Sequence, residues 1–89
     1  MEKSIAVFTT KYVIEENSPI LFIFHDEDGS WQFHGAEDNL TENVSKVVSI
    51  DEIIKFDKTL IKVLNKIPVG YEAYREKKEK EWTIIKSGE

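Results

Sequence analysis

Two histidines and a carboxylate, His25, Asp26 and His34, are the side chains best suited to binding a metal ion. Two imidazoles and one carboxylate can hold a divalent metal and leave coordination positions open. Their spacing matches no established motif such as His-Glu-x-x-His, and carboxylates beside a tight turn are common. A divalent-metal or small-ligand site centred on His25 and His34 is therefore the alternative prediction, and a non-catalytic role is the leading one.

Signatures of catalysis are missing from the sequence. It contains no cysteine, which excludes thiol catalysis, thiolate-bound zinc and a disulfide scaffold. It also contains no Ser-His-Asp spacing and no glycine-rich phosphate loop. A carboxylate pair such as Asp26 and Asp28 is expected in solvent at a hairpin tip, where pKa tuning is weakest. We therefore assign no catalytic residue and no cofactor.

The formal net charge of −5 originates in the first part of the chain. Residues 1–40 hold two lysines against eight acidic residues, a balance of −6, and residues 41–89 hold ten basic against nine acidic residues, a balance of +1. Many of the early acidic residues lie close together: Asp26, Glu27, Asp28, Glu37 and Asp38. Such a surface repels a phosphate backbone, which argues against nucleic-acid binding. It attracts a basic protein partner, mainly by raising the association rate.

Three strands are predicted in the first half of the chain, at Ser4–Thr10, Ile20–His25 and Ser30–His34, from their β-branched and aromatic content. The polar segment Asp26–Gly29 supplies turn chemistry, so the second and third strands form a hairpin. A two-residue or a four-residue loop would place four aromatic residues on one face: Phe22, Phe24, Trp31 and Phe33. We take that aromatic face as the core face, which leaves His25 and His34 together on the other face.

Helix signals follow a further strand at residues 44–48. Ser49 and Glu52 have the spacing of a capping box, which indicates a helix start. Asp57 interrupts the apolar stripe and can cap a second helix, which runs from Lys58 to about Lys66. The residues after Gly70 are ambiguous, because Glu-Lys pairs four apart favour a helix while flanking aromatic and β-branched residues suit a hairpin.

Several blocks, taken in order, carry a family resemblance. They are His25-Asp26-x-Asp28-Gly29-x-Trp31-Gln32-Phe33, then Val47-Val48-Ser49-Ile50 with Glu52, then Asp57 with Leu60, and finally Pro68-x-Gly70-Tyr71-x-Ala73-x-Arg75 with Trp82. This order resembles a group of small bacterial domains related to those proposed as immunity protein thirty-three in polymorphic toxin systems. The resemblance spans about Ile5 to Trp82. It implies an extended segment after Gly70 and a return through Trp82, and it supplies no established activity.

We therefore expect a single domain over residues 1–89 of α+β class, with a mainly antiparallel sheet and two consecutive helices packed on one face. The longest apolar run, Pro19–Phe24, is far shorter than the roughly 20 residues of a membrane-spanning helix. We expect a cytoplasmic protein, either monomer or homodimer, that has no membrane partner.

The leading functional hypothesis is a non-catalytic protein-interaction module, immunity-like as the resemblance implies, that presents an acidic surface to a basic protein partner. Its candidate binding residues are the acidic stretch and three residues after Gly70, where one strand face should stay accessible. They are Asp26, Glu27, Asp28, Glu37, Asp38, Tyr71, Tyr74 and Arg75.

Overall fold

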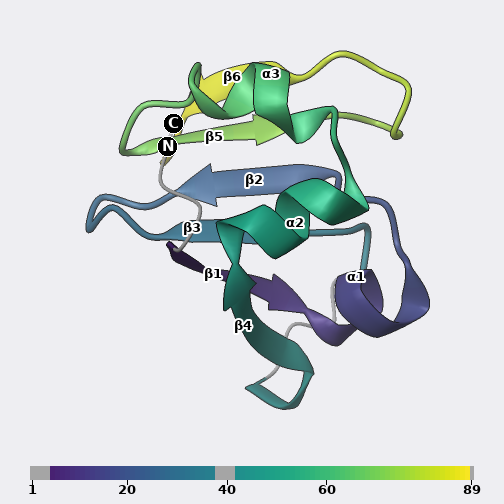
Figure 1. The fold of residues 1–89 in the computed structure, drawn as a ribbon. Helices are drawn as coiled ribbons and strands as arrows, with labels where there is room; N and C mark the ends of the chain where they lie inside the picture. Colours follow the sequence, from purple (N-terminus) through teal and green to yellow (C-terminus); the bar gives the residue numbers. More distant parts are fainter. Residues whose placement is uncertain (1–4, 38–41, 89) are drawn as a thin grey trace.

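The structure is a computed structural model that describes residues 5–37 and 42–88. Within these ranges, six strands form one mixed sheet in the order β4–β1–β3–β2–β5–β6 (Figure 1). Only the neighbours β1 and β3 run parallel, and the other four pairs are antiparallel. The strands are β1 Ala6–Thr10, β2 Phe22–His25, β3 Trp31–His34, β4 Ser45–Ser49, β5 Tyr71–Tyr74 and β6 Thr83–Lys86.

Short helices connect the strands. They are α1 Lys11–Glu16, the 3-10 turn Glu42–Val44, α2 Ile50–Phe56 and α3 Leu60–Leu64. The Ser49 hydroxyl accepts a hydrogen bond from the Glu52 amide at 3.2 Å, so the predicted cap of α2 is confirmed. Asp57 caps the turn leading into α3 by accepting from the Thr59 amide at 3.0 Å. The α1 helix, which no motif of the sequence analysis indicates, begins where the Thr10 hydroxyl accepts from Val13.

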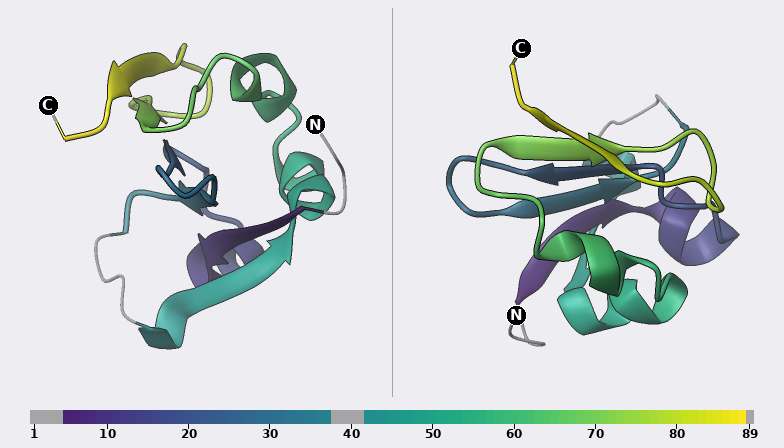
Figure 2. Two further views of the ribbon diagram at one scale, coloured as in Figure 1. Left: turned by 90° about the vertical axis from the view of Figure 1, so that its left-hand side faces the viewer. Right: turned by 90° about the horizontal axis from the view of Figure 1, so that it is seen from above.

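The core lies between the sheet and the helices α2 and α3. Both helices lie on the same side of the sheet, as Figures 1 and 2 show from three directions. One buried cluster combines strand residues with residues of α2, α3 and the turn after α3: Val7, Ile23, Trp31, Phe33, Ala73, Ile50, Ile53, Leu60, Val63, Leu64 and Ile67. Val13 of α1 and Ile20 complete the cluster. The predicted α+β class with a mainly antiparallel sheet is confirmed.

The register of the β2–β3 hairpin differs from the predicted one. The Asp26 amide donates to the Ser30 carbonyl at 2.8 Å, which closes a three-residue loop, and Phe24 pairs with Gln32. Gly29 takes the left-handed conformation that this loop requires, with φ of 89°. Phe22 and Phe24 therefore lie on the face opposite Trp31 and Phe33, so the prediction of one aromatic core face is wrong.

The segment after Gly70 is a hairpin of β5 and β6, as the resemblance implies and against its local helical pattern. Its strand β5 pairs with β2, which places Ala73 opposite Ile23 in the core. Burial of this segment in the sheet thus overrides the helix propensity that its Glu-Lys pairs confer. No helix in the described residues is long and apolar enough to cross a membrane.

The register can be tested by replacing one aromatic residue from each face. Phe33 is 0% exposed and Phe22 is 37% exposed. We predict that Phe33→Leu lowers the free energy of unfolding by about 1–2 kcal/mol, because it leaves a cavity in the core. Phe22→Leu should change it by less than about 0.5 kcal/mol. Urea denaturation of both variants measures the difference, and an equal or larger loss for Phe22→Leu would contradict the observed register.

Candidate protein-binding face

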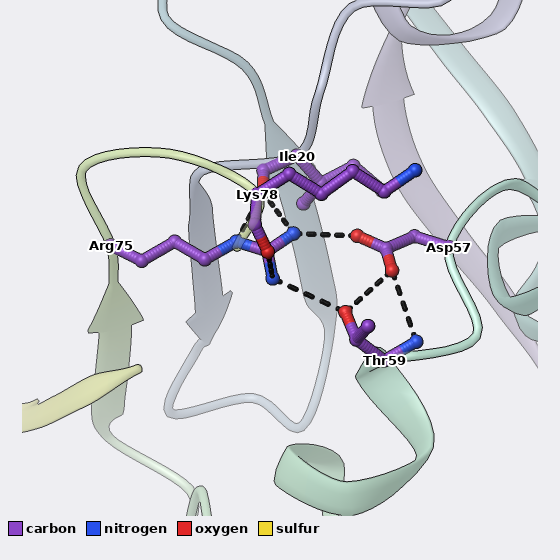
Figure 3. Close-up of polar contacts among 5 residues, drawn as sticks. All are labelled: Ile20, Asp57, Thr59, Arg75 and Lys78. Atoms are coloured by element: carbon purple, nitrogen blue, oxygen red, sulfur yellow. Dashed lines mark hydrogen bonds and ion pairs between the residues drawn. The ribbon is translucent and has the colours of Figure 1, made fainter. Parts of the chain in front are cut away.

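Arg75 is not an accessible binding residue, although it follows directly after β5. Its Nη2 lies 2.5 Å from Oδ2 of Asp57, and the two side chains are only 1% and 3% exposed (Figure 3). The pair lies on the core side of the sheet, where the bend between α2 and α3 meets the end of β5. Arg75 is a predicted binding residue because one strand face should stay accessible, and that expected accessibility is wrong for Arg75, whose side chain is buried in an internal ion pair.

The guanidinium of Arg75 uses all five of its N–H donors. Nε and Nη2 donate to the Ile20 carbonyl at 3.1 and 2.9 Å. Nη1 donates to the Thr59 hydroxyl at 3.2 Å and to the Lys78 carbonyl at 2.9 Å, and the second Nη2 proton goes to Asp57 (Figure 3). The Trp82 ring lies on the guanidinium, 4.2 Å from Cζ to the ring centroid. One side chain thus joins the chain before β2, the α2–α3 bend and the β5–β6 loop.

Asp57 is held ionised by this network. Burial by itself raises the pKa of Asp57, but hydrogen bonds from Thr59 and Arg75, together with the guanidinium charge, outweigh burial. The net result is a pKa below the ordinary value of an aspartate. The carboxylate is therefore a fixed charge of the folded protein at neutral pH.

The opposite side of the sheet carries a row of exposed apolar residues, which we call the outer face. Strand pairing places Phe8 beside Val47, and Phe22 beside Tyr74, with Ile85 next to Glu72. Because side chains alternate along each strand, all of these positions face the same way. Five of them are large apolar residues between 37% and 63% exposed: Phe8, Phe22, Val47, Tyr74 and Ile85.

A polar chain lies along the centre of the outer face. Nε2 of Gln32 donates to Oδ2 of Asp26 at 2.7 Å, and Nε2 of His34 lies 3.1 Å from Oε1 of Gln32. The ring of Phe24 meets the His34 ring edge-on, with centroids 5.6 Å apart. Burial lowers the pKa of His34, and the nearby charge of Asp26 opposes this only in part. The imidazole is therefore held toward its neutral form.

The two histidines lie on opposite faces of the sheet. His25 stacks on Trp31 with centroids 3.7 Å apart, and its Nδ1 donates to the Ile67 carbonyl at 2.8 Å on the core side. The expectation that His25 and His34 share a face is wrong, because it rested on the wrong hairpin register. Within residues 5–37 and 42–88, no three His, Asp or Glu side chains come together in a way that could hold a metal ion.

The predicted acidic stretch is divided by the fold. Asp26 lies on the outer face, and Glu27 and Asp28 are exposed in the adjoining turn. The hydroxyl and then the amide of Ser30 lower the pKa of Asp28 by hydrogen bonding. Glu37 is half-buried at the other end of the hairpin, where it accepts from the Ser18 hydroxyl at 2.7 Å. Asp38 lies outside the described residues.

The two tyrosines of β5 also separate. Tyr71 packs against the core cluster, whereas Tyr74 is exposed on the outer face. The apolar residues of the outer face were not predicted from the sequence. The adjacent pair Val7-Phe8 is a usable signal, because successive strand residues point to opposite faces and a sheet covered on one side leaves one of them exposed.

Comparisons of this chain with protein-family models, with curated proteins and with solved structures found no match. The resemblance to immunity-type domains therefore stays a prediction.

The Arg75–Asp57 pair gives a first prediction for this region. Asp57→Asn should lower the free energy of unfolding by about 3–5 kcal/mol, because it leaves the guanidinium charge buried without its counter-ion. Asp51→Asn is the matched control, since it removes an exposed i,i+4 pair with Lys55 and should cost less than about 1 kcal/mol. Chemical denaturation measures both values. Similar costs for the two substitutions would contradict a structural role for the buried pair. Thr59→Val provides a milder test at the same site, because it removes only the hydroxyl that bonds to Asp57 and Arg75.

The lowered pKa of Asp57 gives a second prediction, on acid stability. A carboxylate with a depressed folded pKa contributes stability that is fully present above its unfolded pKa of about 3.9 and is lost as pH falls through the folded value. The stability gap between wild type and Asp57→Asn should therefore narrow on acidification below about pH 4. Denaturation of both proteins across that range measures the gap. A gap that stays constant would show that Asp57 is not the titrating group.

Proposed function

We propose that this protein is a non-catalytic protein-interaction module whose outer face binds a partner with an apolar and basic surface. The observation that carries the proposal is the row of five large apolar side chains left exposed on one sheet face. Large apolar side chains left exposed together on one face of a small domain are typical of an interaction site. Aromatic residues such as Phe8, Phe22 and Tyr74 are also the kind that anchor protein interfaces.

The charges of the outer face support a basic partner. Among the described strand positions on this face, Glu72 is the acidic one, and Asp26 extends the face at the hairpin end. None of those positions holds lysine or arginine. The chain as a whole carries a net charge of −5, so long-range attraction would steer a basic protein toward it.

The same charges argue against a second copy of the chain as the occupant. A two-fold contact through the outer face would bring Asp26 and Glu72 against an identical acidic surface. Like charges placed opposite each other at an interface typically weaken binding by several kcal/mol, which is enough to exclude a partner. We therefore favour a different protein as partner. The resemblance to immunity-type domains suggests a toxin domain as that protein, and the charge of the outer face requires its binding surface to be basic.

A matched pair of substitutions tests the proposal. Phe22→Ser removes an exposed apolar side chain from the outer face, and Ile61→Ser removes one that is 55% exposed on α3. Proteins captured from the native host by wild type are identified, purified and measured for affinity against both variants. We predict a loss of about tenfold or more for Phe22→Ser, as for an interface anchor, and little change for Ile61→Ser.

Two further results bear on the same experiment. The association rate should fall as salt concentration rises, because salt screens the attraction between the two proteins. The chain alone should remain monomeric at the concentrations used. A purified partner that binds Phe22→Ser as well as wild type, or that is lost only with Ile61→Ser, would overturn the proposal.

A further inference from the structure

A hollow of about 380 Å³ opens on the outer face, beside the polar chain. We call it the Asp26 hollow. Its lining combines two apolar residues, Phe24 and Val44, with polar side chains of β1, β3, β4 and the hairpin end: Thr10, Asp26, Gln32, His34 and Ser45. Its volume falls within the range of about 300–1,000 Å³ that small-molecule sites occupy.

The hydrogen bonds of the polar chain determine how each lining group is oriented. A carboxylate oxygen accepts, so the amide nitrogen of Gln32 faces Asp26, and the Gln32 carbonyl faces His34. That carbonyl can only accept, so the His34 proton is on Nε2. Nδ1 of the neutral ring then carries a lone pair, and it is buried without a partner among the described residues.

The lining of the hollow is therefore rich in hydrogen-bond acceptors. Because burial favours the neutral form of His34, Asp26 supplies the one formal charge among the described residues that line the hollow. The Gln32 carbonyl and the Thr10 hydroxyl already accept from His34 and Val13, and each keeps a second lone pair. The Ser45 hydroxyl adds a further neutral acceptor. The Phe24 ring adds an aromatic surface, which attracts cations through its negative face. Such a set of groups is complementary to a cation that carries several N–H donors.

We propose that the Asp26 hollow binds a basic side chain of the partner, a guanidinium or ammonium group, with Asp26 as its counter-ion. The source of that side chain rests on the proposed function, whereas the affinity of the hollow for a cation does not. Glu27 and Asp28 lie in the same turn but do not line the hollow, and Asp28 already accepts from the amide and the hydroxyl of Ser30. Of these three acidic residues, Asp26 is therefore the one whose charge acts in the hollow.

The test is a nuclear magnetic resonance titration of the full chain with N-acetyl-arginine amide. N-acetyl-citrulline amide serves as the control probe, because it has nearly the same shape and no charge. We predict saturable shifts of the Gln32 side-chain amide and of His34 with the arginine probe, and none that saturate with the citrulline probe. Asp26→Asn should weaken binding about tenfold, the order expected for losing a charged partner of a hydrogen-bonded pair. Asp28→Asn should change it less than about twofold.

The pH dependence gives a readout that a purely structural role of Asp26 would not produce. The described residues that line the hollow together with His34 are Thr10, Phe24, Asp26, Gln32, Val44 and Ser45, and among them Asp26 alone carries a formal charge. Protonation of His34 would place a second cation in the hollow, so the arginine probe should bind more weakly once acidification protonates His34, which the imidazole signals of His34 report in the same titration. An affinity that stays constant while His34 becomes protonated would contradict this arrangement.

The outcomes separate this inference from the proposed function. Equal binding of the citrulline probe, no saturable shift, or an equal loss with Asp28→Asn would overturn the cation site. If the arginine probe binds as predicted while Phe22→Ser leaves partner binding unchanged, the cation site stands and the proposed function fails. If partner binding needs Phe22 but the probe does not bind, the cation site alone fails.

Discussion

The buried pair of Arg75 and Asp57 is the interaction on which the arrangement of this small protein depends. It joins the chain before β2, the α2–α3 bend and the loop after β5, three segments that are distant in sequence. A buried ion pair contributes little net stability, because the cost of removing both charges from water offsets their attraction. The observed arrangement provides partners for all five guanidinium donors, so the pair favours it over arrangements that would leave buried donors unpaired. In this arrangement α2 and α3 lie on one side of the sheet.

This one-sided arrangement gives the two faces of the sheet different chemistry. His25, on the core side, stacks on Trp31 and donates to a backbone carbonyl, which is a structural role. His34, on the outer face, belongs to a chain of side chains that ends at the Asp26 carboxylate. Large apolar side chains surround that chain and remain exposed. A sheet face with both anchors and a directed polar group has the components that specific protein recognition uses.

The local features of this fold are predictable from its sequence, and the long-range ones are not. The cap at Ser49 and the break at Asp57 depend on neighbouring residues, and both are confirmed. The predicted length of the hairpin loop is wrong by one residue, because Asp-Glu-Asp-Gly-Ser suits turns of two, three or four residues. A slip of one residue moves every side chain of a strand to the opposite face. That slip alone produced the aromatic core face and the shared histidine site. The pairing of Arg75 with Asp57 spans 18 residues and depends on tertiary packing, which no local pattern encodes.

The central claim is that the outer face recognises a basic partner and that Asp26 is the counter-ion for one of the partner's basic side chains. A double-mutant cycle between Asp26 and individual arginine or lysine residues of a purified partner tests it most directly, because it isolates one pair from effects on folding. The account predicts a coupling energy of about 1.5 kcal/mol or more for one such pair, the scale seen for close charges across interfaces. Coupling energies near zero for every basic residue at the partner's binding surface would contradict it.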